Sequence, residues 1–197
     1  MCGIAGYIGK KKINDKVINN TLNTMKNRGP DHQNSFSSAY NGTNIYLLHS
    51  RLSIIDLNNR SNQPYTFNGC TLIFNGEIYN YIEIRENLKA EGYTFDTDSD
   101  TEVVIKAYIE YGMDCVKYFN GMWAFVIWDD RQKKIFFSRD RFAEKPLYYY
   151  EDNDGFYFAS EIKAIQSLLQ AKLQINYDHI KRYLVYGYKS LNKTPQE

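Results

Sequence analysis

The chain has 197 residues, of which 43% are hydrophobic and 16% aromatic; it can bury a sizeable core, and the composition argues against disorder. Its 24 basic and 23 acidic residues give a net charge of +1, so neither nucleic acid nor an anionic membrane is indicated as a partner. No apolar stretch reaches the roughly 18 residues of a membrane helix, and no basic segment precedes the apolar N-terminus, so we expect a cytoplasmic protein.

The first half of the chain alternates between strand and helix patterns. It predicts, in order, a strand at Gly3–Gly9, a helix at Asp15–Asn27, strands at Asn44–Ser50 and Cys70–Phe74, a turn at Asn75-Gly76, a helix from about Glu77 to Ala90, and a helix from Ser99 to about Tyr111. The last of these helices begins with Ser99-Asp100-Thr101-Glu102, which has the form of a capping box.

The second half predicts two pairs of strands and then two helices. The strands are Met122–Trp128 with Ile135–Ser138 and Leu147–Tyr150 with Phe156–Ala159, and the helices are Glu161–Leu169 and Tyr177–Tyr186. Strands in hairpin-like pairs, with helices apart from them, favour antiparallel sheet covered by helices.

Cys2 is the first candidate for chemistry. If the initiator methionine is removed, the thiol and a free α-amine share one residue, and the amine, with an ordinary pKa of about 8, can act as the base. By itself a cysteine at position 2 is more often an inert thiol. Cys70 and Cys115 lack zinc-site spacing, so we expect reduced structural thiols and no metal site.

Three further stretches offer partners for such a nucleophile. Arg51, at the end of a predicted strand, can hold a carboxylate or form a structural pair with an aspartate. Asn75 and Gly76 can form an oxyanion hole from a side-chain amide and a backbone N–H, or simply a tight turn. Asp100 can bind an ammonium group, although a capping box needs no further role. His49, in a predicted strand, is more consistent with the core, or with supporting the site residues, than with catalysis.

Together these groups describe a receptor for an α-amino acid with a reactive side-chain carbonyl, and glutamine is the obvious candidate. The motifs also resemble a known family. These motifs are "MCGIAGYIG", "NRGPD", "LLHSRLSIIDL", "LIFNGEIYNY", "SDTEV", "FNGMWAFVIWD" and "SRDRF-EKPLYYY". In this order they look like the class II glutamine amidotransferase domain, the N-terminal half of glutamine-hydrolysing asparagine synthetases, and the likeness covers residues 1–187.

The resemblance implies an α+β fold of the N-terminal-nucleophile hydrolase type, a four-layer αββα sandwich of two antiparallel sheets. It implies hydrolysis of glutamine to glutamate and ammonia by Cys2. Asn75 and Gly76 would form the oxyanion hole, Arg51 would bind the carboxylate, and Asp100 with Glu77 would bind the α-amine. The stretch Leu52, Ser53, Ile54 and Ile55 would line the pocket.

The sequence departs from the family in two ways. Ala143 stands where the family usually has glycine, and a positive φ there would strain the loop. The C-terminal ATP-dependent synthetase domain of the family is absent, so residues 188–197 would begin the linker to it. ATP and Mg²⁺ are expected only in that domain, and no cofactor is expected in this one. Whether the chain forms a homodimer is left open by the sequence.

Three functions remain compatible with the sequence. The chain can be the glutaminase half of an asparagine synthetase, which converts aspartate to asparagine. It can also be the same half of a ligase that amidates another acceptor, such as a sugar acid of a surface polysaccharide. The third is a module that senses glutamine without hydrolysing it.

Overall fold

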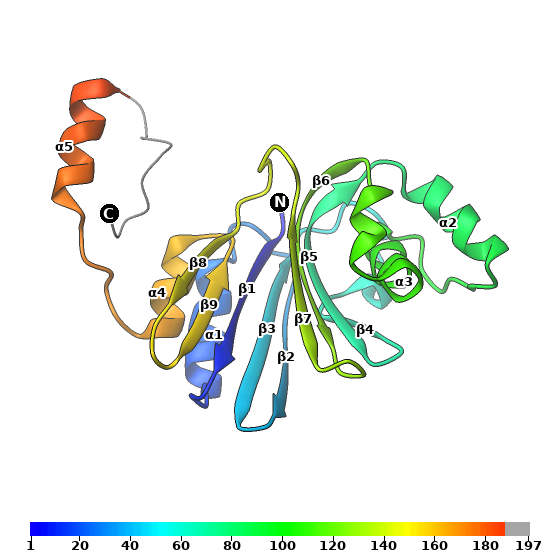
Figure 1. Cartoon of the computed structure of the whole chain (residues 1–197), viewed down its shortest axis with the longest axis horizontal. Helices are drawn as coiled ribbons and strands as arrows, with labels where there is room; N and C mark the ends of the chain where they lie inside the picture. The colour runs from blue at the N-terminus through cyan, green and yellow to red at the C-terminus, as the bar shows by residue number, and fades with distance from the viewer. Residues whose placement is uncertain (188–197) are drawn as a thin grey trace.

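The computed structural model describes residues 1–187, and the predicted linker at residues 188–197 lies outside the described residues. Two antiparallel sheets pack face to face, and helices cover the outer face of each (Figure 1). The first sheet has the strand order β2-β3-β1-β9-β8, and the second has the order β4-β5-β6-β7. This arrangement confirms the predicted α+β, four-layer αββα fold.

The elements have the following bounds. The first sheet comprises β1 (Gly3–Gly9), β2 (His32–Tyr40), β3 (Thr43–Arg51), β8 (Tyr148–Glu151) and β9 (Gly155–Ala159). The second comprises β4 (Tyr65–Phe67), β5 (Cys70–Ile78), β6 (Gly121–Asp129) and β7 (Lys134–Arg139). The α-helices are α1 (Asp15–Thr24), α2 (Tyr81–Ala90), α3 (Asp100–Tyr111), α4 (Ile162–Leu169) and α5 (Tyr177–Tyr186), and two 3₁₀ turns are η1 (Asn59–Ser61) and η2 (Gly112–Lys117).

Three apolar layers hold the sandwich together. Helices α1 and α4 pack on the first sheet, and α2 and α3 pack on the second. Between the sheets lies a layer of buried residues from both: Ile4, Ile45, Leu47, Ile73, Ala124, Val126, Trp128 and Phe158. Because side chains alternate along a strand, each inner strand supplies one face to this layer and the other to a helix layer.

The structure corrects the sequence predictions around Asn75-Gly76. This dipeptide is no turn, because β5 runs through it to Ile78 and α2 begins only at Tyr81. Asn75 pairs with Ala124 and Gly76 with Trp123, so the neighbouring strand β6 keeps the backbone extended. Two strands, β2 and β4, were not predicted at all, since their sequences are mostly polar or very short.

Other predictions are confirmed, except that the capping box at the start of α3 is only half formed. Cys70 and Cys115 are free and buried. Ser99 caps α3 through a hydrogen bond from the Thr101 backbone N–H, but Glu102 does not close the capping box, because its carboxylate accepts hydrogen bonds from the preceding loop. Ala143 has a φ of 56°, so the predicted strain is present in the β7–β8 loop.

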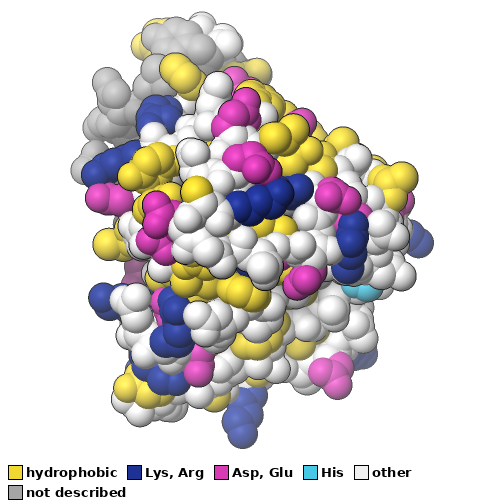
Figure 2. Space-filling model, turned by 90° about the vertical axis from the view of Figure 1, so that its right-hand side faces the viewer, with side chains coloured by type: hydrophobic (Ala, Val, Ile, Leu, Met, Phe, Trp, Pro, Cys, Tyr) yellow, Lys and Arg dark blue, Asp and Glu magenta, His cyan; other side chains and the backbone are white. Residues whose placement is uncertain are grey.

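The surface agrees with a nearly neutral chain. Figure 2 shows basic and acidic side chains interspersed over the face that α2 and α3 cover. Helix α5 lies away from the sandwich (Figure 1), and none of its residues is buried. Within residues 1–187, no helix is both long and apolar enough to cross a bilayer.

Candidate active site

The layer between the sheets becomes polar at one end of the strands. On β5, Asn75 stands two residues after the buried Ile73, and on β3, Arg51 stands four residues after the buried Leu47. Both therefore continue the face that points between the sheets. Cys2 lies directly before β1, at the same end. The alternation of side chains along β3 and β5 thus directs Arg51 and Asn75 into the space between the sheets, at the end where Cys2 also lies.

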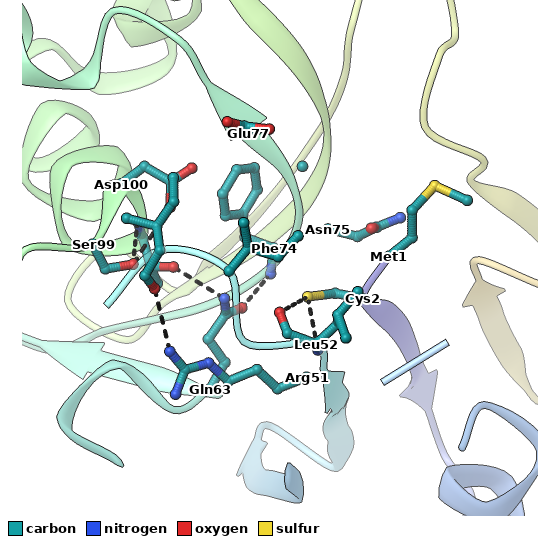
Figure 3. A pocket seen from close by; sticks show the side chains of 14 residues that line it. Met1, Cys2, Arg51, Leu52, Gln63, Phe74, Asn75, Glu77, Ser99 and Asp100 are labelled. Carbon is teal, nitrogen blue, oxygen red and sulfur yellow. Dashed lines mark hydrogen bonds between the residues drawn. The ribbon is translucent and has the colours of Figure 1, made fainter. Parts of the chain in front are cut away.

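These residues line one pocket, which Figure 3 shows from close by. Cys2 and Asn75 lie on one side of the pocket and Ser99 and Asp100 on the other, while Arg51 reaches in from β3. The lining residues are Met1, Cys2, Arg51, Leu52, Ile54, Ile55, Gln63, Phe74, Asn75, Gly76, Glu77, Ser99, Asp100 and Thr101.

The Cys2 thiol is held by the backbone that follows β3. Its Sγ lies 3.4 Å from the Leu52 backbone nitrogen, which donates to it, and 3.6 Å from the Leu52 carbonyl oxygen. Burial raises the pKa of this thiol, and the hydrogen bond from Leu52 opposes the rise. A thiol in this setting is protonated near neutral pH and needs a base to become a nucleophile.

Asn75 presents an unused donor to the pocket. Its side chain is 1% exposed, and its Nδ2 has no hydrogen-bond partner among the described residues. A buried amide without a partner costs stability, so such a donor in a pocket beside a thiol is suited to bind an oxygen atom.

The backbone of β5 offers a second donor at the same edge. The Phe74 N–H donates to Gln63 Oε1 at 2.6 Å, and the Ile78 N–H donates to Asp100 Oδ2 at 3.1 Å. Since N–H groups alternate in direction along a strand, the Gly76 N–H between them faces the same open edge. Asn75 and Gly76 therefore offer two hydrogen-bond donors at this edge, and two such donors beside a thiol are suited to stabilise an oxyanion.

Glycine at position 76 is explained by packing. A Cβ there would lie 2.4 Å from the Met122 carbonyl oxygen and 2.8 Å from the Trp123 Cα. The neighbouring strand β6 fills this space, so the residue is small to allow strand packing rather than close approach of a substrate.

Arg51 is a buried cation held by neutral groups. Its guanidinium donates to Asn62 Oδ1 at 2.7 Å and to the Asn58 carbonyl at 3.0 Å, and it also contacts the carbonyls of Ile55 and Asp56. No ion pair is found for it within the described part of the chain, so the structural Arg–Asp pair that the sequence left open is absent. The positive charge is well placed for a carboxylate of a ligand.

Asp100 supplies the opposite charge. It is 5% exposed, and burial raises its pKa to about 6, although hydrogen bonds from the Ile78 N–H and the Ser99 hydroxyl favour the charged form. The carboxylate of Glu77, half-buried in the same pocket, raises this pKa further. Two acidic groups facing one pocket are suited to hold an ammonium group.

The predicted stretch from Leu52 to Ile55 is brought to the pocket only in part. Leu52, Ile54 and Ile55 line it, whereas the Ser53 backbone N–H is directed to Asp31 Oδ2 at 2.7 Å. The role of Ser53 as a pocket residue therefore stays a prediction without geometric support.

Two pocket neighbours carried little signal in the sequence. Gln63 joins β5 to α3, because its amide accepts from the Phe74 N–H and donates to Thr101 Oγ1. Arg28 donates to the Cys2 carbonyl at 2.9 Å and pairs with Glu161 at 3.3 Å. Arg28 follows the predicted helix Asp15–Asn27 directly and belongs to the NRGPD motif, whereas no local sequence pattern indicates Gln63.

His49 links the two sheets beneath the pocket. Its Nε2 lies 3.2 Å from the Phe74 carbonyl oxygen, which fixes that nitrogen as the donor of a neutral ring. Burial lowers the pKa of His49 to about 3, so the ring stays neutral at any working pH. The predicted core position of His49 is confirmed.

Comparison with known proteins agrees with this geometry. A family model described as a glutamine amidotransferase domain matches residues 1–197. A relative in Methanocaldococcus jannaschii, named putative asparagine synthetase [glutamine-hydrolyzing] 2, is 40% identical over 95% of this chain. Another in Bacillus subtilis, named asparagine synthetase [glutamine-hydrolyzing] 3, is 36% identical over 89% of this chain.

The chain spans 40% and 29% of the length of these two relatives. Its fold is similar to a solved glutamine phosphoribosylpyrophosphate amidotransferase from B. subtilis, with a TM-score of 0.68 and 18% identity. That likeness covers 87% of this chain and 44% of the other, and it bears on the fold alone.

Proposed function

Since this chain belongs to the glutamine amidotransferase domain family, we propose that it hydrolyses glutamine to glutamate and ammonia at Cys2. The observation that carries the proposal is the unpartnered Nδ2 of Asn75, buried in the same pocket as the thiol. The amide N–H groups of a structural asparagine are hydrogen-bonded within the protein. An asparagine of an oxyanion hole keeps an N–H free, and this group forms its hydrogen bond when negative charge develops on the substrate oxygen.

The substrate would bind by its two charged ends. Its carboxylate would lie on Arg51, and its ammonium group would lie between Asp100 and Glu77. With both ends held, the side-chain amide would reach toward Cys2 and the donors on β5. Binding at fixed points converts the attack into a reaction within one complex, which lowers its entropic cost.

The chemistry would proceed through a thioester. A base takes the thiol proton, and the thiolate attacks the side-chain carbonyl carbon of glutamine. Asn75 Nδ2 and the Gly76 N–H stabilise the tetrahedral oxyanion. The protonated base gives its proton to the departing nitrogen, which leaves as ammonia. Water, activated by the same base, then hydrolyses the thioester to release glutamate and restore the thiol.

We propose that the base is the α-amine of Cys2, which requires removal of Met1. Met1 is 57% exposed and lies at the edge of the pocket beside Cys2 (Figure 3). The burial that raises the thiol pKa makes a nearby base necessary, and an amine on the same residue is the nearest.

We further propose that the ammonia serves a C-terminal, ATP-dependent synthetase domain in a longer protein. The length of the curated relatives supports this step, and their names favour aspartate as the acceptor. ATP and Mg²⁺ would act in that domain. The glutaminase half would need no cofactor, because its nucleophile, base and oxyanion donors are its own groups. The free thiols at Cys70 and Cys115 favour the reducing cytoplasm as its location.

The test is release of glutamate from glutamine by the purified chain with Met1 removed. We expect Cys2→Ala to abolish release while the melting temperature stays within a few degrees. Cys115→Ala is the matched control, because that thiol is buried in an apolar core cluster and does not line the pocket, and it should retain turnover.

Equal release from the parent and from Cys2→Ala would overturn the assignment of the nucleophile. Tight binding of glutamine by the parent, without turnover, would favour the sensing function instead.

A further inference from the structure

Two loops adjoin the groups that would bind the charged ends of glutamine, Arg51 at the end of β3 and Asp100 at the start of α3. The 52–62 loop, residues 52–62 after β3, surrounds the Arg51 guanidinium, whose hydrogen-bond acceptors in Ile55, Asp56, Asn58 and Asn62 all lie in this loop. The 94–99 loop, residues 94–99, leads into α3 and ends beside Asp100. The position of each ion-binding group therefore depends on its own loop.

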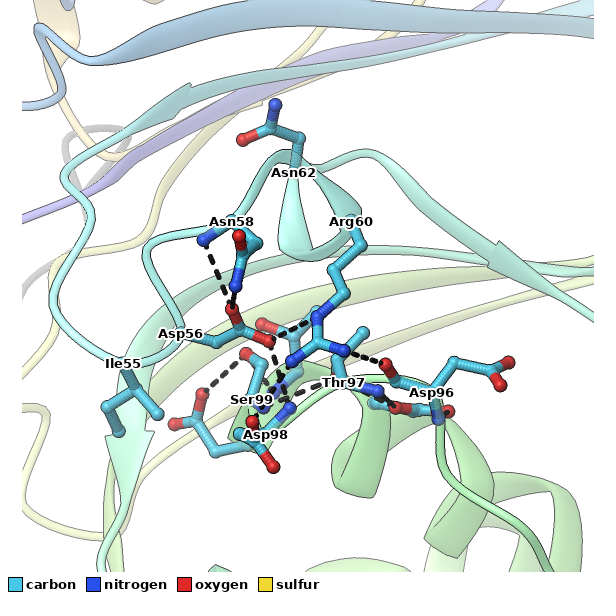
Figure 4. Close-up of polar contacts among 12 residues, drawn as sticks. Ile55, Asp56, Asn58, Arg60, Asn62, Asp96, Thr97, Asp98 and Ser99 are labelled. Carbon is cyan, nitrogen blue, oxygen red and sulfur yellow. Dashed lines mark hydrogen bonds and ion pairs between the residues drawn. The ribbon is translucent and has the colours of Figure 1, made fainter.

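Asp56 connects these two loops (Figure 4). Its Oδ2 accepts a hydrogen bond of 2.9 Å from the Asp98 backbone N–H in the 94–99 loop. Its Oδ1 accepts from the backbone and side chain of Asn58, at 3.1 and 3.0 Å, within its own loop. One carboxylate thus stabilises the fold of the first loop and anchors the second.

The backbone of Asp56 faces the other way, toward the carboxylate-binding group. Asp56 has a φ of 50°, in the left-handed region that aspartate and asparagine tolerate better than most residues. Its carbonyl oxygen accepts from Arg51 Nη2, while its side chain reaches the 94–99 loop. A single residue therefore touches Arg51 through its backbone and the Asp100 loop through its side chain.

The Asp56 carboxylate is buried and charged. Its side chain is 1% exposed. Burial alone would raise its pKa, but hydrogen bonds from the Asp98 N–H and from Asn58 outweigh this and hold the pKa well below its usual range. The acceptor is therefore ionised at every working pH.

Arg60 adds a weaker, more exposed connection. Its Nε donates to Asp56 Oδ2 at 3.0 Å, and its other nitrogens reach the Asp96 carbonyl at 2.6 Å and Asp98 Oδ2 at 3.0 Å. The Arg60 side chain is 46% exposed and that of Asp98 is 77% exposed, so solvent weakens the pair between them.

We propose that Asp56 is a positioning residue that sets the distance and angle between Arg51 and Asp100, so that the two ends of glutamine are recognised as one unit. The inference rests on the proposed function. It differs from a role in loop stability alone, because it predicts a loss of substrate binding with the chemical groups at Cys2 and Asn75 intact.

The first measurement is steady-state glutaminase kinetics of Asp56→Asn. Asparagine keeps the shape and tolerates the positive φ, but it replaces one acceptor oxygen by a donor. We expect KM for glutamine to rise about tenfold while kcat stays within about twofold, because binding is lost equally in the ground and transition states. Arg60→Gln should move KM in the same direction by about two- to fivefold.

The second measurement is amide hydrogen exchange of the ligand-free chain by NMR, which does not depend on turnover. In Asp56→Asn, exchange should accelerate at the Asp98 amide and across the 52–62 loop together. Asp96→Asn is the matched control, because it makes the same chemical change on an exposed side chain of the 94–99 loop, and both readouts should stay at parent values.

The outcomes separate this inference from the proposed function. Unchanged exchange at Asp98, or KM within twofold of the parent, would overturn the inference and leave glutamine hydrolysis standing. A fall in kcat at constant KM would also overturn it, since Asp56 would then act on the chemistry. A parent chain without glutaminase activity would overturn the proposed function itself and the positioning role with it.

Discussion

Asp100 is an acidic residue of the pocket whose pKa is raised toward neutral pH. Burial raises its pKa to about 6, whereas an ammonium group bound beside it favours the charged form and lowers that pKa. Glutamine affinity should therefore be greatest above pH 6 and should fall by up to about tenfold per pH unit below it. Calorimetric titration of the inactive Cys2→Ala variant between pH 5 and pH 8 measures this without turnover.

Asp100→Asn provides the control for this titration. Its affinity should be weak and nearly independent of pH between pH 5 and pH 7, because the titrating carboxyl is gone. A pH dependence that persists in this variant would assign the titration to a group other than Asp100.

At the scale of single residues, the sequence predicts the charged and reactive groups of the pocket better than it predicts the residues that hold them in position. Cys2, Arg51, Asn75 and Asp100 all line the pocket, because their chemistry is visible in the residue type. Asp56 carries no such signal, since its importance comes from a contact across 42 residues of sequence. Contacts of that separation depend on how the sheets pack and leave no local pattern.

At the scale of elements, β5 differs most from its sequence pattern. An Asn-Gly dipeptide is a common turn signal, but pairing with β6 keeps it extended over the full strand. The polar sequence of β2 likewise becomes a strand only because it pairs with β3 over nine positions. Local propensity failed at both places because a neighbouring strand supplied the decisive hydrogen bonds.

The packing of β5 on β6 makes Gly76 intolerant of any side chain. Gly76→Ala should lower the free energy of unfolding by about 3 kcal/mol, because its Cβ would overlap the backbone of β6. Gly42→Ala is the control: its φ of 78° strains alanine, but nothing lies within 4 Å, so about 1 kcal/mol is expected. Urea unfolding compares the two, and equal losses would show that β5 can shift to accept a methyl group.

At the scale of the whole molecule, the sandwich and helix α5 are separate in their packing. Helix α4 buries Ala164, Ile165 and Leu168 against the first sheet, whereas α5 buries none of its residues. The sequence predicted both helices equally well, since its pattern reports amphipathic character and not what a helix packs against.

This difference predicts unequal effects of truncation. A chain ending at Gln174 should melt within about 2 °C of a chain ending at Gly187, because no residue of α5 is buried. A chain ending at Ser160, which also lacks α4, should lose most of its cooperative unfolding transition. Calorimetry distinguishes the cases, and a large loss on removing α5 alone would mean that it contributes to the fold.

The placement of the pocket across both sheets has a consequence for the order of events during biosynthesis. Cys2 precedes a strand of the first sheet, while Asn75 and Gly76 belong to the second, so the thiol and the β5 donors come together only when the two sheets pack. On the proposed function, a nascent chain would not hydrolyse glutamine before that packing. Glutamate release would then report that the two sheets have docked.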